Sequence, residues 1–464
     1  MLQGIRKIHF IGVGGAGMSA LARILLDKGY EVSGSDQKMS DVAKQLAARG
    51  AKIFEGHDAS NVAGAEAVVV STAIPEDNAE LVAAKARGIR RLHRSDVNAA
   101  LLNAAQGIAV AGAHGKTTTT SMIGLILEHG GVDPTIIIGG QVDYLADGNA
   151  RLGRGAYLVS EADESDGSFL KLTPHIAVVT NVENDHMDHY GTMENIKKAF
   201  RQFLENTDEK TGVCVLCADN GNLREISRGL SRRVVFYGTA EDAEYRAANI
   251  VPEGAGVAFD VEKNGKTLVR VRLSIPGHHN VLNALGSVVT GILCGVSPEK
   301  AAEALALFHG AKRRFETKGR AAGVWIVDDY AHHPTEITAT LRAARQTSPK
   351  RLICAFQPHR YSRTQLLQKE FGGAFRDADL LVLTDVYSAG EAPITGVSGA
   401  TIVAAVKEAT GQEVTYIKAR ADVAPYLATM VREGDLVMTM GAGDICRTGE
   451  ELLALLPAQG EHKE

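Results

Sequence analysis

The sequence has no excess of positive charge, because its 464 residues include 50 Lys and Arg against 55 Asp and Glu. No run of Lys and Arg is interleaved with aromatic residues, so the charge pattern of a nucleic-acid-binding protein is missing. No apolar stretch reaches the 18 or more residues of a membrane-spanning helix, and glycine breaks the first apolar run too early for a signal peptide. We therefore expect a cytoplasmic protein that neither binds nucleic acid nor inserts into a membrane.

Cysteine is also scarce, and its number is odd. Five cysteines in a long chain argue against a framework of disulfides. Cys214 and Cys217 form one C-x-x-C, but strand alternation would point their side chains to opposite faces, and a structural zinc site needs four ligands. We expect both to be buried strand residues.

Glycine is abundant, with 49 residues, and many of them stand between a predicted strand and a predicted helix. This order of strand, turn and helix starts anew in three blocks, which begin near residues 7, 106 and 312. Alternating strands and helices predict parallel sheets covered by helices, and the length fits about three domains. Asn264 and Gly265, between two alternating runs, predict a hairpin and hence a small antiparallel appendage.

The first glycine turn, "GVGGAG" at 12–17, matches G-x-G-x-x-G, with a strand before it and a helix after it. Asp36 follows at the distance expected for a residue that binds a ribose hydroxyl. Such a turn lets the backbone approach a pyrophosphate at a helix N-terminus. The pattern leaves open whether the ligand is NAD or another nucleoside diphosphate.

The second glycine turn, "GAHGKTT", ends like a phosphate-binding loop but is short. Only two residues separate Gly112 from Gly115, whereas the usual pattern has four. A strand precedes the turn and a helix follows it, so Lys116 is placed to neutralise nucleotide phosphates and the Thr117 hydroxyl to bind Mg²⁺. This turn predicts a triphosphate site.

Acidic and basic side chains follow several predicted strands. The segments "EADESD" and "NDHMDH" each come directly after an apolar strand, at the sheet edge where ligands bind in α/β folds. Carboxylates together with phosphates suit Mg²⁺. In the third block, "DDYAHHP" and "FQPHRYSR" also follow strands, and Arg360 and Arg363 can hold a carboxylate or phosphate.

Asn280 and Asn283 stand at the start of a predicted helix, either as caps or as partners of an adenine.

As a set, these motifs resemble those of the Mur ligase family, the ATP-dependent amide-forming ligases of bacterial cell-wall precursor synthesis. The segments "GAHGKTT", "EADESD", "NDHMDHYG", "GHHNVLNA", "KRRFE" and "DDYAHHP" occur in the family's order over all three blocks. "GVGGAGMSALA" and "FQPHRYSRT" are most similar to the members that join L-alanine to UDP-N-acetylmuramate. Members that attach a whole tripeptide to the same sugar nucleotide are the near alternative.

The resemblance implies an α/β fold of three domains. A Rossmann-like UDP-sugar-binding domain spans 1–106, and a central P-loop ATPase-type parallel sheet with the antiparallel appendage spans 107–311. A Rossmann-like C-terminal domain spans 312–464, closes over ATP and binds the amino acid. The expected assembly is a monomer or a weak homodimer.

The resemblance also implies roles for individual residues. The UDP-substrate would contact Gly14, Gly15, Gly17, Asp36, Ser71 and Thr72. ATP would contact Gly112, Ala113, His114, Gly115, Lys116, Thr117, Thr118, Asn280, Asn283, Arg314 and Asp328. Mg²⁺ would be held by Thr117, Glu161 and His186, and the amino acid by Tyr330, His332, Arg360 and Arg363. Among these, Lys116, His332 and Arg363 are the expected catalytic residues. Several relatives carry a carbamylated lysine where Phe200 falls here, so we expect no such modification.

Two other functions compete with the ligase. An NAD-dependent oxidoreductase would use the turn at 12–17 with Asp36, and Lys116 would then be dispensable. A nucleotide-binding switch would need no amino-acid pocket. The second glycine turn, the acidic clusters and the arginines of the third block favour the ligase.

Overall fold

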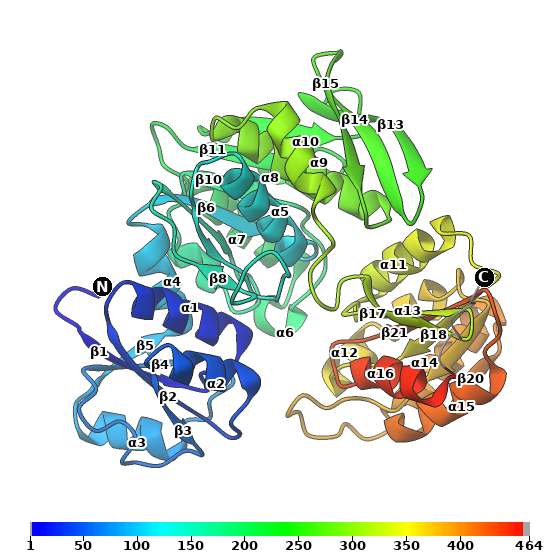
Figure 1. Cartoon of the computed structure of the whole chain (residues 1–464), viewed down its shortest axis with the longest axis horizontal. Coiled ribbons are helices and arrows are strands. Elements are labelled where there is room, and N and C mark those ends of the chain that lie inside the picture. Colours follow the sequence, from blue (N-terminus) through cyan, green and yellow to red (C-terminus); the bar gives the residue numbers. More distant parts are fainter. Residues whose placement is uncertain (1, 458–464) are drawn as a thin grey trace, which may run out of the picture. The chain divides into compact units, whose positions relative to one another are not determined.

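The computed structural model describes residues 2–457. Its strands form three sheets, of five, ten and six strands, in which parallel pairs predominate. This confirms the predicted three-domain α/β class (Figure 1). The chain packs as two compact units. The first holds the residues up to Asn249 together with Phe259–Val271 and Leu282–Phe308, and the second holds Ile250–Ala258, Arg272–Val281 and the residues from His309 onward.

The first sheet has the order β3-β2-β1-β4-β5, and all of its pairs are parallel. Its strands are β1 (Lys7–Ile11), β2 (Glu31–Asp36), β3 (Lys52–Glu55), β4 (Ala67–Val70) and β5 (Arg90–His93). They alternate with α1 (Ala16–Asp27), α2 (Asp41–Ala48), α3 (Ala79–Ala86) and α4 (Arg94–Leu102). The strand order reverses beside β1, so the loops after β1 and β4 open at the switch point where α/β sheets bind ligands.

The central sheet has the order β15-β14-β13-β12-β11-β10-β6-β9-β7-β8. Its strands are β6 (Gln106–Ala111), β7 (Thr135–Ile137), β8 (Ala150–Arg151), β9 (Tyr157–Glu161), β10 (Ile176–Val179), β11 (Val213–Cys217), β12 (Arg233–Gly238), β13 (Tyr245–Glu253), β14 (Gly256–Lys263) and β15 (Lys266–Leu273). β10 and β11 are buried along their whole length, which is typical of central parallel strands covered on both faces. The predicted hairpin at Asn264 and Gly265 joins β14 to β15, and these strands extend the central sheet through the parallel pair β12–β13.

The helices of this region include α5 (Lys116–His129), η1 (Ser168–Lys171), α6 (Met187–Tyr190), α7 (Met193–Glu205), α8 (Gly221–Ile226), α9 (His278–Leu293) and α10 (Pro298–Ala306). In α7 the buried residues Ile196, Phe200, Phe203 and Leu204 share one face at helical spacing. The N-cap hydroxyl of Thr192 begins this helix. Cys214 and Cys217 on β11 are buried free thiols, as predicted.

The third sheet lies in the second unit and has the order β16-β17-β21-β18-β19-β20. Its strands are β16 (Glu316–Ala321), β17 (Val324–Asp329), β18 (Arg351–Phe356), β19 (Leu380–Leu383), β20 (Val414–Tyr416) and β21 (Asp435–Met440). Only β16 pairs in antiparallel fashion among the described strands of this sheet.

Helices cover both faces of the third sheet. They are α11 (Pro334–Gln346), α12 (Tyr361–Leu366), α13 (Gln368–Ala374), α14 (Gly399–Thr410), η2 (Arg420–Asp422), α15 (Val423–Met430) and α16 (Cys446–Leu455). One hydrophobic core contains Leu341, Phe371 and Ile402, from α11, α13 and α14. The other contains Leu427 and Leu452, from α15 and α16. Such two-sided cover is what a mostly parallel sheet requires.

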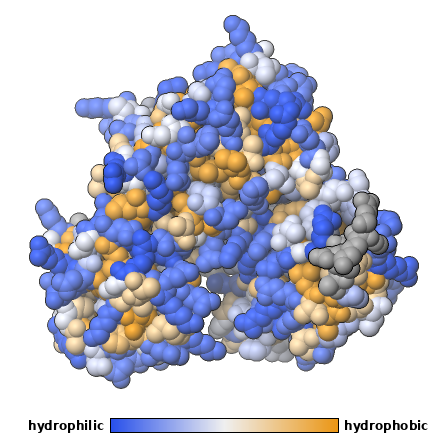
Figure 2. Space-filling view, in the orientation of Figure 1, coloured by the Kyte–Doolittle hydropathy of each residue, from blue (hydrophilic) through white to orange (hydrophobic). Residues whose placement is uncertain are grey.

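The exposed surface is mainly hydrophilic on the face drawn in Figure 2, with hydrophobic residues in small groups. The large hydrophobic residues that are exposed in the described chain come from separate elements, for example Val82 of α3 and Leu366 of α12. None of the helices within residues 2–457 combines the length and the apolar character that a membrane crossing needs.

Candidate functional site

The second glycine turn forms a compact loop between β6 and α5. Gly112 and Gly115 have φ of +136° and +84°, a backbone region that favours glycine. A Cβ on Gly115 would lie 2.6 Å from Asn283 Oδ1, and one on Gly112 would collide with Thr180 Oγ1. The short spacing between the two glycines therefore gives a loop whose backbone packs directly on neighbouring side chains.

The two residues that follow β10, Thr180 and Asn181, form hydrogen bonds with this loop. The Thr180 hydroxyl donates to the carbonyl of His114 at 2.6 Å, and the Asn181 side chain accepts from the His114 amide at 2.9 Å. Sequence reasoning did not select Thr180 or Asn181. The signal that would have found them is their position directly after the buried strand "IAVV", at the edge where the loop itself stands.

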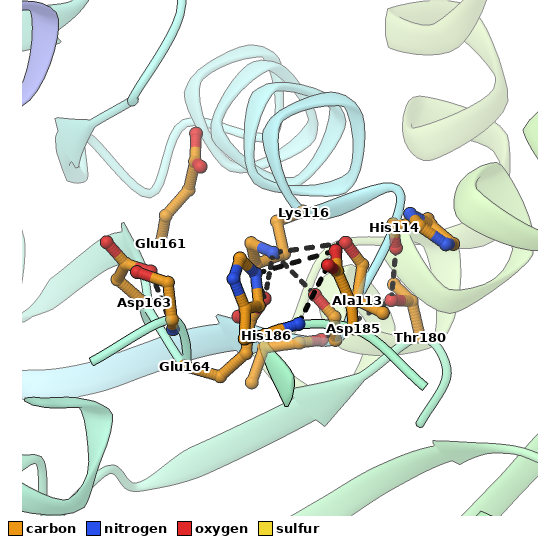
Figure 3. A network of polar contacts seen from close by, with 12 residues as sticks. Ala113, His114, Lys116, Glu161, Asp163, Glu164, Thr180, Asp185 and His186 are labelled. Carbon is orange, nitrogen blue, oxygen red and sulfur yellow. Dashed lines mark hydrogen bonds and ion pairs between the residues drawn. The ribbon is translucent and has the colours of Figure 1, made fainter. Parts of the chain in front are cut away.

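Lys116 begins α5 and points back over the loop (Figure 3). Its ammonium donates to Glu164 Oε1 at 2.7 Å and to the carbonyl of Gly112 at 2.6 Å. Burial acts to lower the pKa of Lys116, but Glu164 and the neighbouring carboxylates outweigh it, and the pKa is raised. The lysine is therefore a positive charge held where a phosphate would enter the loop.

Glu161 ends β9 and faces the helix start. Its Oε2 accepts from the Thr117 hydroxyl at 3.1 Å, and its Oε1 accepts from the Gly139 amide at 2.7 Å. Thr117 and Glu161 thus offer the hard oxygen atoms that Mg²⁺ prefers, next to a phosphate loop. The structure thus places two of the expected Mg²⁺ ligands in contact with each other.

His186 comes from the loop after β10 and completes the cluster. Its Nε2 lies 3.5 Å from Glu164 Oε1 and 3.5 Å from Asp185 Oδ2. Burial lowers the pKa of His186, but the bond to Glu164 and the charge of Asp185 reverse this, and the pKa is raised. Glu164 Oε2 is buried and has no hydrogen-bond partner within the described residues. A buried carboxylate oxygen without a donor fits a cation, so Glu164 Oε2 is the atom of this cluster that suits the implied metal ion.

Asp163 connects the acidic cluster to the first sheet. Its carboxylate pairs with Arg94, the first residue of α4, and accepts from the Ser165 amide at 3.0 Å. Burial opposes ionisation here, but Arg94 and then Lys116 hold the pKa of Asp163 well below its usual range. Neither Arg94 nor this cross-link was predicted, because nothing in the local sequence marks Arg94.

The first glycine turn also forms as predicted, between β1 and α1. The amides of Gly12 and Val13 donate to the carbonyl of Ser35 at 2.8 and 2.9 Å. Asp36 accepts from the Gly14 amide at 2.8 Å. The carboxylate that the motif assigns to a ribose therefore also closes the turn itself.

The loop after β4 lies beside this turn. The side chain of Ile74 stands 3.1 Å from the position that a Cβ on Gly12 would take, and Ser71 and Thr72 belong to the same loop. Gly14, Gly15, Gly17, Asp36, Ser71 and Thr72 thus border one sheet edge, since β1 and β4 are parallel neighbours.

In the second unit, Arg314 and Asp328 do not pair with each other. Asp328 is fully buried, accepts from Arg313 Nε at 3.0 Å and from the Thr439 hydroxyl at 2.7 Å, and its pKa is raised by burial despite Arg313. Arg314 lies 3.5 Å from Glu336, and both arginines stack on the ring of Tyr330. Sequence reasoning selected Asp328 but missed its partner Arg313.

The ends of β17 and β18 meet at one rim, as predicted. The rings of His332 and His359 are 5.8 Å apart, and His359 stacks on Tyr387 with an interplanar angle of 10°. Arg363 Nη1 lies 3.3 Å from His359 Nδ1, and Arg360 lies 3.9 Å from Glu391. Burial, and then the charges of His332 and the arginines, lower the pKa of His359 to about 3. This positive rim suits an anionic group such as an amino-acid carboxylate.

Three other predicted residues have defined surroundings. Asn280 lies in the first turn of α9 and donates to the carbonyl of Pro276 at 2.7 Å, and Asn283 lies one turn later, against the phosphate loop. Phe200 is buried in α7 with its ring 5.2 Å from that of Phe169. It belongs to the core of this region.

Comparison with protein-family models gives one match in each third of the chain. Residues 7–106 match the model described as Mur ligase family, catalytic domain, and residues 110–291 match the Mur ligase middle domain. Residues 313–443 match the model described as Mur ligase, glutamate ligase domain.

Individual relatives are similar over almost the whole chain. The UDP-N-acetylmuramate–L-alanine ligase of Pelotomaculum thermopropionicum is 49% identical, with 97% of this chain and 98% of the relative covered. The enzyme of the same name from Desulforamulus reducens is 50% identical with the same coverage. Among solved structures, the UDP-N-acetylmuramate-alanine ligase of Thermotoga maritima matches with a TM-score of 0.82 at 30% identity, covering 97% of this chain and 98% of that one. A murein peptide ligase from Psychrobacter arcticus matches with a TM-score of 0.72 at 26% identity, with the same coverage.

Proposed function

Because the chain belongs to the Mur ligase family, we propose that it is an ATP-dependent, ADP-forming ligase that joins L-alanine to the lactyl carboxylate of UDP-N-acetylmuramate in bacterial peptidoglycan precursor synthesis. The two relatives that share about half of its residues over nearly their full length carry this activity in their names. The observation that carries the proposal is the phosphate loop itself, in which Lys116 faces Glu164 while Thr117 faces Glu161. A dehydrogenase has no use for this second nucleotide site.

The first step activates the carboxylate. A carboxylate oxygen of the sugar nucleotide attacks the γ-phosphorus of ATP, the bond between that phosphorus and the bridging oxygen breaks, and ADP leaves, giving an acyl phosphate. The loop from Gly112 to Thr118 supplies backbone amides, and Lys116 supplies the positive charge that stabilises the transferring group. Mg²⁺ would be held by Thr117, Glu161 and His186, and it would neutralise charge on the phosphate oxygens.

The second step forms the amide. The neutral amine of L-alanine attacks the acyl carbon, a tetrahedral intermediate forms, phosphate leaves with the electrons of the broken C–O bond, and the amine loses a proton. His332 is the candidate to influence this proton, since its Nδ1 contacts the Tyr330 carbonyl at 3.0 Å and Glu336 at 3.4 Å. Tyr330, Arg360 and Arg363 would hold the amino acid.

The remaining assignments follow from the same proposal. The glycine turn at 12–17 with Asp36, Ser71 and Thr72 would hold the UDP part, so the turn that resembles a dinucleotide fingerprint serves a substrate. Asn280 and Asn283 would lie at adenine, and Arg314 and Asp328 would serve the phosphates and ribose. We place the three domains at 1–106, 107–311 and 312–464, and we expect a cytoplasmic monomer or weak homodimer.

A coupled phosphate-release assay tests the function. Release should require ATP, Mg²⁺, UDP-N-acetylmuramate and L-alanine together, and a panel with glycine, L-serine and the cell-wall tripeptide separates this activity from that of the tripeptide-adding relatives. Release that continues unchanged without an amino acid would contradict ligation. A change in nicotinamide absorbance in place of phosphate release would support the oxidoreductase.

A further inference from the structure

A fully buried arginine lies at the junction of α1 with the central sheet. Arg23 on α1 is 1% exposed, and a buried guanidinium is costly unless its donors are bonded. Its Nη2 donates to Gln45 Oε1 at 2.7 Å, and its Nη1 donates to Asn149 Oδ1 at 2.5 Å and to the carbonyl of Asp147. Gln45 belongs to α2, whereas Asp147 and Asn149 belong to the segment before β8. Arg23 therefore links α1 and α2, which alternate with the strands of the first sheet, to the segment before β8 of the central sheet.

Asn149 is the residue that Arg23 orients, and it bonds back to the start of α1. Its Nδ2 donates to the carbonyl of Ala16 at 2.9 Å and to Ser19 Oγ at 3.1 Å. Ala16 is the first residue of the helix that follows the glycine turn. The 2%-exposed amide of Asn149 is thus bonded on both sides, and it fixes the end of the helix at which the UDP-substrate is proposed to bind.

The same segment reaches the phosphate loop at its other end. The Asn149 carbonyl accepts from the Ile138 amide at 2.9 Å, and the next amide, that of Gly139, donates to Glu161 at 2.7 Å. A Cβ on Gly140 would lie 2.8 Å from the Thr117 methyl group. The bond to Asn149 and the bond to the candidate metal ligand Glu161 are therefore made by the amides of two adjacent residues, Ile138 and Gly139.

A continuous path of bonds consequently runs from the first turn of α1 to Glu161, the candidate metal ligand beside the phosphate loop. α1 packs on both β7 and β8, the strands that flank this segment. Arg23 and Asn149 themselves bond to groups of α1, α2 and the segment before β8, so an effect on turnover would act through alignment. Phosphoryl transfer is sensitive to alignment, because a displacement of about 1 Å can reduce the rate by about 100-fold.

We propose that Asn149, held by Arg23, is a positioning residue for phosphoryl transfer: it sets the place of the UDP-substrate helix relative to Glu161 and Thr117. The proposal rests on the function proposed above and extends it to two residues that are not among the expected substrate contacts. It differs from a purely structural role, which would alter the stability of the junction without a specific effect on turnover.

The test compares Asn149→Ala, Arg23→Lys and Arg23→Met with wild type. Four quantities are measured: kcat, the Kd of UDP-N-acetylmuramate, the Kd of a non-hydrolysable ATP analogue with Mg²⁺, and the Tm. We expect Asn149→Ala to lower kcat at least about tenfold while each Kd changes by less than about threefold. Arg23→Lys, which keeps a donor, should retain more of kcat than Arg23→Met.

Arg151→Ala is the matched control. Arg151 ends the same segment on β8, but its bonds run to Asp133 at 2.5 Å, to the Pro134 carbonyl at 3.0 Å and to Glu128 at 3.3 Å, none of which belongs to α1. This variant should keep the wild-type kcat. A lowered Tm with an unchanged kcat in both Asn149→Ala and Arg23→Met would overturn the positioning role while leaving the ligase function standing. A wild-type protein that binds no UDP-N-acetylmuramate and releases no phosphate would overturn the proposed function and this inference with it.

Discussion

Lys116 Nζ lies 2.7 Å from Glu164 Oε1, so the lysine of the phosphate loop is paired with a carboxylate of the acidic cluster. Glu164 is 3% exposed and also lies 3.5 Å from His186. The carboxylate thus stands between the side chains of Lys116 and His186. A bound triphosphate would take over the role of Glu164 as the anionic partner of Lys116.

Lys116→Ala should abolish ligation and spare UDP-substrate binding. Removing one charged donor from a transferring phosphoryl group typically costs about 100-fold or more in rate. The glycine turn that would hold UDP is built from β1 and α1 of the first sheet, and it shares no hydrogen bond with Lys116. Phosphate release reports the first effect, and titration calorimetry with UDP-N-acetylmuramate reports the second. A parallel loss of UDP-substrate affinity would contradict the separation of the two sites.

Gly14→Ala should raise the KM of UDP-N-acetylmuramate by about tenfold. A Cβ at this position would lie 2.7 Å from Asp36 Oδ2 and 3.1 Å from Ser40 Oγ, so the turn must shift away from the carboxylate that closes it. The matched control is Gly221→Ala in α8, where nothing lies within 4 Å of the new Cβ. Steady-state kinetics on both variants provide the comparison, and equal KM values would remove Gly14 from the substrate site.

The glycine turns and the acidic clusters could be predicted because their signals are local. A strand, a glycine turn and a helix start occupy about twenty consecutive residues, and parallel strands bring their carboxyl ends to one edge. In the structure Thr117 contacts Glu161, and His186 contacts Glu164 of the same acidic segment. His332 and Arg363 both lie beside His359.

The pairings across long sequence separations could not be predicted in this way. Arg23 and Asn149 are 126 positions apart, and Arg94 and Asp163 are 69 apart. Nothing in the sequence around Arg23 distinguishes it from an exposed helix arginine, since its burial depends on how a segment of the central region packs on α1. Similarly, Asp36 fits the motif for a ribose ligand, and only the folded turn reveals its bond to the Gly14 amide.

Arg363→Ala should raise the KM of L-alanine more than it changes the Kd of ATP. Arg363 lies in α12 against His359, at the rim where the ends of β17 and β18 meet. Losing a guanidinium that binds a carboxylate typically costs about 1.5–3 kcal/mol, which corresponds to an interaction weakened about 10- to 160-fold. Arg376→Ala, an exposed arginine after α13, is the control. An amino-acid KM that does not change would remove Arg363 from the pocket.

Glu80 is the centre of a buried polar network under the first sheet's ligand edge. Its carboxylate is fully buried and accepts from the Ser35 hydroxyl at 2.5 Å and from Asn61 Nδ2 at 2.6 Å. It also lies 3.2 Å from His57 Nδ1 and 3.7 Å from His9 Nε2. Burial alone would raise the pKa of Glu80, but His9, Ser35 and Asn61 outweigh it and lower the pKa from 4.5 to about 2.

This shift predicts acid sensitivity of a defined sign. A carboxyl whose pKa is lower in the folded state stabilises the fold fully above its unfolded pKa, and the contribution is lost as pH falls from about 4.5 to about 2. The shift corresponds to about 3 kcal/mol of unfolding free energy at neutral pH. Glu80→Gln should lower the unfolding free energy by about this amount at pH 7, because it removes the negative charge that the network stabilises. The new amide NH₂ would also face groups that are themselves hydrogen-bond donors.

Denaturant unfolding from pH 7 to pH 2 checks this prediction. The difference between wild type and Glu80→Gln should shrink as pH falls below about 4.5, since protonation removes the same charge from the wild type. Glu76→Gln is the control: Glu76 pairs with Arg91 on the exposed surface at 2.8 Å, and such pairs contribute little. A stability difference for Glu80→Gln that stays constant over the whole pH range would mean that its ionised form is not what the network stabilises.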